Sequence, residues 1–473
     1  MSKRIIKSRF SYFCAVQLPV QLIHSLQGIP GFEEPAFTAI HQSGKQVTSL
    51  RLNPLKTTDI DLIIEGKSIE ATPVGWAADS YYLSERPSFT FDPLFHAGCY
   101  YVQEASSMFV EQALKQSVDL SKPLKVLDLC AAPGGKSTLI QSLLTKDSLL
   151  VTNEVIRQRV NILKDNIIKW GCDNVVVTNN DPKDFSKLPG FFDVIVVDAP
   201  CSGSGLFRRD EEAIEEWSEN NVMLCSQRQQ RILADVLPAL KEGGVLIYST
   251  CSYSKQEDED IIDWISEQFQ ISNLKLAISN DWGITEVETS EDNYGYRFWP
   301  NLVKGEGFFL AVFRNEQTNH FKNKTKIQTK TVSKQLLPIV SKWADVQQHE
   351  LVQVNTKVYA WPKYLFDNFD LIVQNLRVIY SGTLLGEQIH QKLIPDHALA
   401  MSNMALLKTQ TVDVDYDTAI MYLQKDSIVI ASSNAGWQLL SFKNKPLGWV
   451  NILSNRVNNY YPKELRILKR TVG

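Results

Sequence analysis

Apolar stretches alternate with amphipathic ones through the middle of the chain, and this pattern predicts strands that alternate with helices. Strands are expected at Val126–Cys130, Leu149–Glu154, Asn174–Asp181, Phe192–Pro200 and Val245–Cys251. Apolar residues at three- and four-residue steps predict helices over 101–118, Ser137–Leu144, Arg157–Trp170, Val222–Leu240 and Gln256–Phe269. This alternation favours a doubly wound parallel sheet. The apolar run Gly307–Phe313 is expected to close that sheet as an antiparallel strand.

The first 98 residues mix strand and turn signals. Ser49–Lys56 predicts a strand that runs into a proline turn, with Arg51 and Lys56 exposed at its ends. Basic and aromatic residues interleave in this segment, as in proteins that contact RNA, although half-buried strands have the same composition.

Beyond residue 316 the composition and the hydrophobic pattern of the chain change. Residues 317–334 hold five lysines and no acid, which predicts a flexible linker, either a solvated tether or an RNA contact. Short apolar runs at Lys357–Pro362, Leu376–Gly382 and Ser427–Ser432 then predict a small β-rich barrel.

Two further patterns are compatible with RNA contact, and each has a plainer explanation. The basic tail interleaves Trp449, Tyr460 and Tyr461, which suits base stacking but also suits a hydrophobic core. Arg208 and Arg209 could hold phosphates, although the acidic run that follows them would repel RNA and favours a solvated helix start.

Composition narrows the class of protein. The length of 473 residues predicts two to four domains. No apolar run is long enough to span a membrane, and the basic N-terminus has no apolar segment typical of a signal peptide. Seven cysteines without a C-x-x-C pair argue against zinc and disulfides. Reduced thiols fit a cytoplasmic protein best. The net charge of −4 indicates that the molecule as a whole is not a basic nucleic-acid binder, so that local basic clusters must be considered instead. We further expect a monomer that binds neither membrane nor metal.

The stretch Lys125–Lys136 (KVLDLCAAPGGK) combines a buried strand, a glycine turn and the start of a helix. Pro133 ends the strand, and Gly134 and Gly135 allow a ligand to approach the backbone closely. Strand, glycine turn and helix together indicate a nucleotide-binding crevice. A Walker A loop is excluded because Cys130 stands where its first glycine is required.

Acidic residues lie in or at the ends of the first three strands. Asp128 lies in the first strand, Glu154 follows Gly134 by 20 positions, and Asp181 ends the third strand. An acid at the second position commonly accepts hydrogen bonds from ribose hydroxyls. The three acids favour an adenosine site, although each could be a surface acid or, for Asp181 before Pro182, a helix cap.

Two cysteines follow neighbouring strands of the expected sheet, in D-A-P-C-S-G-S-G (Asp198–Gly205) and Y-S-T-C-S (Tyr248–Ser252). Parallel strands end at one edge, so Asp198, Cys201 and Cys251 are expected to face one cleft. A thiolate that adds to carbon 6 of a pyrimidine makes carbon 5 nucleophilic, and a carboxyl group at N3 would select cytosine. The pattern alone does not show which of the two cysteines is the nucleophile.

These three motifs, D-L-C-A-A-P-G-G-K, D-A-P-C-S-G and Y-S-T-C-S, resemble the signature of the Sun/Nop family of S-adenosylmethionine-dependent RNA cytosine-C5 methyltransferases. The resemblance implies that Cys251 is the nucleophile and that Cys201 assists product release, the reverse of the order in DNA cytosine methyltransferases. It also implies an S-adenosylmethionine site formed by Cys130, Ala131, Ala132, Pro133, Gly134, Gly135, Lys136, Glu154, Asp181 and Asp198.

The flanking motifs resemble one branch of that family. R-L-N-P-L-K is similar to its N-terminal RNA-binding segment, and G-W-V-N…N-R-V-N-N-Y-Y-P-K resembles the PUA-like tail of the bacterial branch that methylates 16S ribosomal RNA. The resemblance implies 16S ribosomal RNA in a small-subunit context as substrate. A transfer RNA methyltransferase or a non-catalytic ribosomal RNA-binding assembly factor are the alternatives.

The expected architecture is therefore α/β, with a Rossmann-like methyltransferase sheet between two smaller parts. The expected parts are an N-terminal mixed α/β RNA-binding domain (1–98), the methyltransferase domain (99–316), a Lys-rich linker (317–337), a small intermediate domain (338–395) and a β-rich PUA-like domain (396–473).

Overall fold

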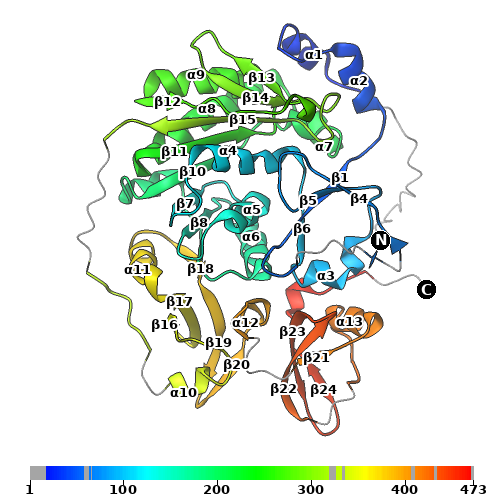
Figure 1. Cartoon of the computed structure of the whole chain (residues 1–473), viewed down its shortest axis with the longest axis vertical. Coiled ribbons are helices and arrows are strands. Elements are labelled where there is room, and N and C mark those ends of the chain that lie inside the picture. Colours follow the sequence, from blue (N-terminus) through cyan, green and yellow to red (C-terminus); the bar gives the residue numbers. More distant parts are fainter. Residues whose placement is uncertain are drawn as a thin grey trace, which may run out of the picture.

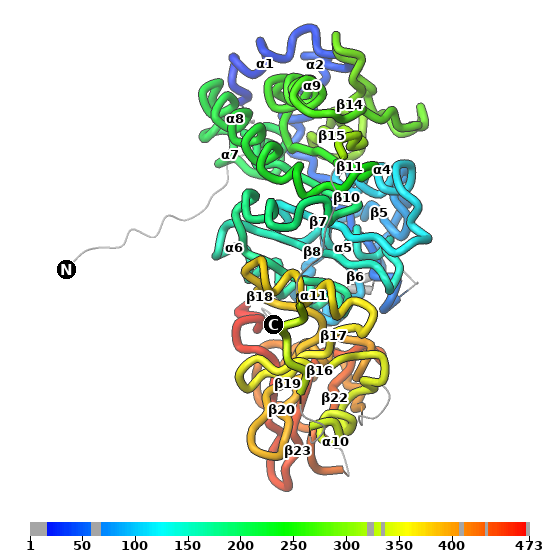
Figure 2. The backbone as a smooth tube through the Cα atoms, turned by 90° about the vertical axis from the view of Figure 1, so that its left-hand side faces the viewer, coloured from blue at the N-terminus to red at the C-terminus, as the bar shows by residue number. Residues whose placement is uncertain are grey.

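The computed structural model describes residues 17–57, 63–64, 67–318, 326–332, 336–405, 411–430 and 434–469. The molecule is elongated, with the largest sheet towards one end and two small C-terminal sheets at the other (Figures 1 and 2). Within the described residues no helix combines the length and the apolar character needed to cross a bilayer.

The central sheet has the strand order β13-β14-β15-β11-β10-β7-β8-β9-β18, with β12 beside β15. Strands β7 to β11 are parallel, and β15 runs antiparallel to β11. This confirms the doubly wound Rossmann-like sheet and the antiparallel direction of β15. The expected closure at β15 is wrong, because β14 and β13 continue the sheet beyond it. The strands are β7 (Lys125–Asp128), β8 (Leu149–Asn153), β9 (Val175–Thr178), β10 (Phe192–Asp198), β11 (Leu240–Thr250), β12 (Ile271–Asn273), β13 (Thr285–Glu288), β14 (Tyr294–Phe298), β15 (Phe308–Asn315) and β18 (Val378–Ser381).

Helices cover both faces of this sheet because its central strands are apolar on both sides. Val194 and Val196 of β10 pack into one core, and Ile195 and Val197 pack into the other. Helices α4 (Val110–Ser117), α5 (Gly135–Leu143) and α6 (Arg157–Trp170) contribute to the first core, and α8 (Glu219–Val236), α9 (Glu259–Gln268) and α11 (Phe366–Asn375) contribute to the second.

The N-terminal part carries its own antiparallel sheet, in the order β4-β5-β1-β6. The helix predicted over 101–118 is wrong at its start, because Tyr100–Val102 form strand β6 and pair with β1. A 3₁₀ turn follows at Ser106–Phe109 before α4 begins. The elements before it are α1 (Val20–Leu26), α2 (Glu34–Gln42), β1 (Thr48–Leu52), the hairpin β2 (Ile63–Ile64) and β3 (Lys67–Ser68), β4 (Ala71–Pro73), β5 (Ser80–Leu83) and α3 (Pro93–His96).

Three polar side chains of the R-L-N-P-L-K motif attach this part to the methyltransferase helices, and we call them the interdomain clamp. Arg51 donates to Thr138 Oγ1 (2.7 Å) and Ser142 Oγ (3.1 Å) on α5. Asn53 Nδ2 donates to the carbonyls of Gly98 and Trp170, both at 3.0 Å. Lys56 Nζ donates to the carbonyls of Ala97 (2.8 Å) and Lys169 (2.7 Å).

The predicted exposure of Arg51 and Lys56 is therefore wrong. Arg51 is only 2 % exposed and lies 4.7 Å from the centre of the Trp170 ring. Burial lowers the pKa of Lys56 to about 8, and both cations have backbone or side-chain acceptors within the protein. Neither is available to RNA phosphates.

The C-terminal part contains two four-stranded sheets. The first runs β16-β17-β19-β20 and the second β21-β22-β23-β24. The predicted strand at Ser427–Ser432 is not observed over Ser427–Ile430, and its last two residues lie outside the described chain. The elements are α10 (Leu337–Val340), β16 (His349–Val354), β17 (Lys357–Pro362), β19 (Thr383–Ile389), β20 (Lys392–Pro395), α12 (His397–Met401), β21 (Thr411–Asp413), α13 (Tyr416–Leu423), β22 (Gly436–Phe442), β23 (Lys445–Ile452) and β24 (Val457–Asn459).

The segment between linker and tail also contributes to the central sheet. Its strand β18 pairs antiparallel with β9, placing Val378 opposite Thr178 and Ser381 opposite Val176. Part of the predicted linker, 319–325 and 333–335, lies outside the described residues. The backbone N–H of Thr329 donates to Asp370 of α11 at 2.7 Å, so that part of the predicted linker is attached to the protein.

We predict that Asn53→Ala lowers the free energy of unfolding by about 2–4 kcal/mol, because it leaves the buried carbonyls of Gly98 and Trp170 without their donor. Urea denaturation followed by circular dichroism measures the change. Asn403→Ala, at an exposed asparagine, is the matched control and should shift the value by less than about 0.5 kcal/mol. Equal losses of stability in the two variants would contradict a stabilising role for Asn53 in the interdomain clamp.

Candidate active site

The glycine turn after β7 is held by side chains of α6. Gly134 has φ +114°, a conformation that is strained for a residue with a side chain, and it directly precedes α5 as its N-cap. Arg159 Nη2 donates to the carbonyl of Ala132 (2.6 Å), and Asn166 Nδ2 donates to that of Pro133 (2.8 Å). With these carbonyls bonded to α6, the turn is a fixed platform at the carboxyl end of β7.

Asp128 lies beneath this turn and is fully buried. Its Oδ2 accepts from Ser137 Oγ at 2.6 Å, while Oδ1 has no hydrogen-bond partner among the described residues. Burial, reinforced by the charge of Asp198, raises the pKa of Asp128 to about 7. The strand therefore ends in a carboxyl group that is about half protonated near pH 7.

A hollow of about 210 Å³ opens between the glycine turn and the N-terminal part. The glycine turn was predicted from the sequence. The opposite wall of the hollow, formed by residues between 101 and 107, was not, because this segment was expected to be helical. The residues that line the hollow are Tyr101, Val102, Gln103, Glu104, Ser107, Cys130, Ala131, Ala132, Pro133, Gly135, Lys136 and Asp198.

Glu154 and Asp181 are not among the described residues that line this hollow. Glu154 is buried, accepts from the backbone N–H of Ile156 at 2.8 Å and pairs with Arg159 at 3.5 Å. Asp181 caps a 3₁₀ helix, accepting from the backbone N–H of Lys183 at 3.3 Å. Their contact with an adenosine group stays a prediction.

The two cysteines of the D-A-P-C and S-T-C motifs lie side by side. Cys201 Sγ is 3.0 Å from Cys251 Sγ, and both residues are partly buried. Gly205 allows this approach: its N–H donates to the carbonyl of Cys251 (2.9 Å), and a Cβ there would lie 2.8 Å from the same oxygen. The loops after β10 and β11 therefore pack against each other and hold two thiols in one place.

Asp198 connects the cysteine loops to the glycine turn. Its Oδ1 accepts from Ser249 Oγ (2.9 Å), and its Oδ2 pairs with Lys136 Nζ (2.8 Å). The pKa of Lys136 is raised: burial opposes the charged form, but the charge and hydrogen bond of Asp198 outweigh it, and Cys251 adds to the effect. The hydrogen bond that the Cys201 thiol shares with Cys251, followed by burial, raises the pKa of Cys201 well above its usual range.

Several residues proposed for RNA contact instead make contacts within the protein. Arg208 is buried and donates to the carbonyls of Gly305 (3.0 Å) and Lys45 (2.6 Å). The acidic run after it forms the solvent-exposed helix α7 (Glu211–Glu216). In the tail, Trp449 and Tyr461 belong to the core, whereas Tyr460 is 39 % exposed.

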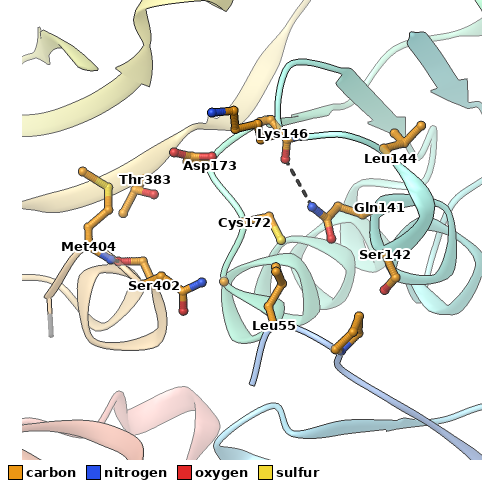
Figure 3. Close-up of a pocket in the computed structure, with 14 residues that line it drawn as sticks. Leu55, Gln141, Ser142, Leu144, Lys146, Cys172, Asp173, Thr383, Ser402 and Met404 are labelled. Carbon is orange, nitrogen blue, oxygen red and sulfur yellow. Dashed lines mark hydrogen bonds between the residues drawn. The ribbon is translucent and has the colours of Figure 1, made fainter. Parts of the chain in front are cut away.

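A second cavity, of about 250 Å³, lies where the three parts of the chain meet (Figure 3). Leu55, Gln141, Cys172 and Met404 are among its lining residues, and the cysteine pair is not. No group of three or more potential metal ligands occurs in the part of the chain that the structure describes.

Sequence profiles of one kind of methyltransferase match most of the chain. The profile described as 16S rRNA methyltransferase RsmB/F matches residues 116–314. The profile for the N-terminal domain of 16S rRNA methyltransferase RsmF matches residues 18–105, and the profile for the methyltransferase RsmF PUA domain matches residues 409–467.

Solved structures support the same fold. A methyltransferase homologue from Pyrococcus horikoshii is 27 % identical, with a TM-score of 0.51 over 63 % of this chain and 100 % of that one. NSun6 from Pyrococcus horikoshii, solved with SFG, is 18 % identical with a TM-score of 0.52 over 63 % of this chain and 98 % of that one, a likeness of fold alone.

Two curated relatives align with nearly the full length of the protein. Ribosomal RNA small subunit methyltransferase F of Shewanella loihica is 29 % identical over 445 residues, 88 % of each chain. The protein of the same name from Aeromonas salmonicida is 30 % identical over 441 residues, which are 88 % of this chain and 90 % of the relative. By this similarity over 88 % of its length, the chain belongs to the family of ribosomal RNA small subunit methyltransferase F.

Proposed function

We propose that this protein transfers a methyl group from S-adenosylmethionine to carbon 5 of a cytosine in RNA, with 16S ribosomal RNA as the substrate, through a covalent bond between Cys251 and carbon 6. The observation that carries the proposal is the pair of thiols 3.0 Å apart, beside an Asp198–Lys136 ion pair and a glycine turn. The names of the relatives support ribosomal RNA as the substrate.

The glycine turn and its hollow fit the adenosine cofactor. Neither Gly134 nor Gly135 has a side chain to obstruct a ligand, and the hollow opens directly on Cys130, Ala131 and Ala132. S-adenosylmethionine bound there would supply an activated methyl group. Glu154 and Asp181, at the ends of the next two strands, would hold its ribose and adenine.

The thiol pair and Asp198 would carry the covalent chemistry. The Cys251 thiolate would add to carbon 6 of the ring, and the electron pair of the C5–C6 double bond would move to carbon 5. Carbon 5 would then take the methyl group as its bond to the sulfonium sulfur breaks, which leaves S-adenosylhomocysteine. Because thiolate addition makes the ring anionic, Asp198 would balance that charge only as a carboxylic acid that donates its proton to N3, after its ion pair with Lys136 has opened. Loss of the proton from carbon 5 to a base would then restore the double bond and expel Cys251, and Cys201 would assist this release once it has lost its own proton.

The two thiols differ in their surroundings. Cys251 is one of the groups that raise the pKa of Lys136, after the larger effect of Asp198. Contact with Cys251 and burial raise the pKa of Cys201 and favour its neutral form. Because the thiolate is the nucleophilic form of cysteine, a neutral Cys201 is the poorer candidate for the attack.

We propose that the C-terminal part supplies RNA affinity rather than chemistry. The ring of Tyr460 lies 4.2 Å from that of Trp437, and Tyr460 is the exposed aromatic residue among the three of the tail motif. An exposed ring of this kind can stack on an unpaired base.

The two cysteine variants test the mechanism. Cys251→Ala should reduce methyl transfer at least about 1,000-fold and form no covalent RNA complex. Cys201→Ala should still attack and methylate, and should remain attached to its RNA through Cys251. Denaturing gel electrophoresis with labelled 16S ribosomal RNA and labelled cofactor distinguishes these outcomes.

The control is Cys172→Ala, which removes a buried thiol at the cavity of Figure 3 and should leave turnover unchanged. A trapped complex with Cys251→Ala, but not with Cys201→Ala, would reverse the two roles. Methylation of transfer RNA in place of ribosomal RNA would be consistent with the proposed reaction but would contradict the proposed substrate. Full activity in Cys251→Ala would overturn the covalent mechanism.

We expect S-adenosylmethionine to bind without a metal ion. Calorimetry on protein treated with a chelator should give the same affinity as on untreated protein. Gly134→Val should weaken binding at least about tenfold, because a branched side chain at φ +114° distorts the turn. Affinity that is lost with the chelator and restored by zinc or magnesium would contradict this prediction.

We expect Tyr460→Ala to weaken RNA binding about 5- to 150-fold, the loss of one stacked base, without changing cofactor affinity. Filter binding at several salt concentrations measures it, and the salt dependence should stay unchanged because no phosphate contact is removed. Exposed Tyr364→Ala, on the intermediate segment, is the control. An equal loss in both variants would refute a specific stacking role for Tyr460.

A further inference from the structure

A buried carboxylate behind the cysteine pair has no part in the mechanism above. Glu257 ends the short 3₁₀ helix Lys255–Glu257 and has no exposed surface. Its Oε1 accepts from the backbone N–H of Ser202 at 2.7 Å, and its Oε2 accepts from Ser202 Oγ and from Ser252 Oγ, both at 2.6 Å.

The two serines are the residues that directly follow the two cysteines. Ser202 follows Cys201 in the loop after β10, and Ser252 follows Cys251 in the loop after β11. One carboxylate therefore joins two loops that the chain separates by 50 residues. Hydrogen bonds to a charged group are stronger than those between neutral groups, so this bridge constrains the positions of both cysteine backbones.

Glu257 also acts on the protonation of Cys201. Burial raises the pKa of Glu257, although the hydrogen bonds from the serines favour the ionised form. After the effects of Cys251 and burial, the charge of Glu257 is a further cause of the raised pKa of Cys201. The carboxylate thus favours a protonated Cys201.

We propose that Glu257 is a positioning residue that sets the spacing of Cys201 and Cys251 through Ser202 and Ser252. The consequence for methyl transfer rests on the proposed function, but the spacing of the thiols does not. At 3.0 Å the thiols are close enough for mild oxidation to join them. The oxidant diamide would take two electrons and two protons from the pair, becoming a hydrazine as the disulfide forms.

The experiment measures the rate of this disulfide in the folded full-length protein without RNA, by alkylation of free thiols and mass spectrometry. Glu257→Ala should form the disulfide about tenfold more slowly than Glu257→Gln, because both variants remove the charge that favours a protonated Cys201 but only Glu257→Ala also removes the bridge. A displacement of about 1 Å can cost up to about 100-fold between two held groups. Glu257→Gln should stay within about threefold of the unmodified protein, since an amide can accept from Ser202 and donate to a hydroxyl.

Ser252→Ala tests the same bridge without removing the carboxylate, and it should also slow the disulfide if Glu257→Ala does not fold. Asp263→Asn is the matched control, because Asp263 is a carboxylate of α9 that accepts from Asn293 at 2.8 Å, away from the cysteine loops. It should lower stability and leave the rate unchanged. Equal rates in Ser252→Ala, Asp263→Asn and the unmodified protein would overturn the proposal.

Methylation kinetics separate this proposal from the function on which it partly rests. Glu257→Ala should lower kcat about tenfold or more with little change in KM for RNA, and Glu257→Gln should restore most of it. If the unmodified protein methylates no RNA, the proposed function fails, while the disulfide rates still decide whether Glu257 sets the spacing. A rise in KM with kcat unchanged would overturn the positioning role.

Discussion

In the parallel ladder between β10 and β11, Asp198 lies opposite Ser249, and the geometry of the candidate site depends on this register. Both strands end at the same edge of the sheet, so the loops that carry Cys201 and Cys251 start side by side. Ser249 Oγ bonds Asp198, and Lys136 joins the same carboxylate from the glycine turn. A slip of one residue would turn every side chain of β11 to the opposite face and separate the acid from its partners.

Polar contacts of the interdomain clamp then fix how the N-terminal part is oriented on the methyltransferase sheet. The clamp of Arg51, Asn53 and Lys56 fixes the N-terminal part against α5 and α6, and that part forms the second wall of the hollow. Its acceptors are mostly backbone carbonyls at the ends of helices and turns. Such contacts are directional, so they orient the N-terminal part in a way that apolar packing alone would not.

The sequence was most informative where one local pattern decides the structure. The apolar runs of β10 and β11 predicted two buried parallel strands, and from them the approach of Asp198, Cys201 and Cys251 followed. Exposure of Arg51 and Lys56 was predicted wrongly, because their acceptors lie on distant segments such as α5 and Lys169 and leave no local signal. The pattern at 101–118 suited a helix, but pairing with β1 prevailed at Tyr100–Val102.

Strand β18 has a consequence for how the chain folds during synthesis. It covers the edge of β9, yet Val378 leaves the ribosome 200 residues after its partner Thr178. At about 5–20 residues per second, the edge of β9 waits about 10–40 s for its partner strand. An uncovered strand edge can pair with another chain. During this period, pairing of the exposed β9 edge with another protein chain competes with pairing of β9 with its own strand β18.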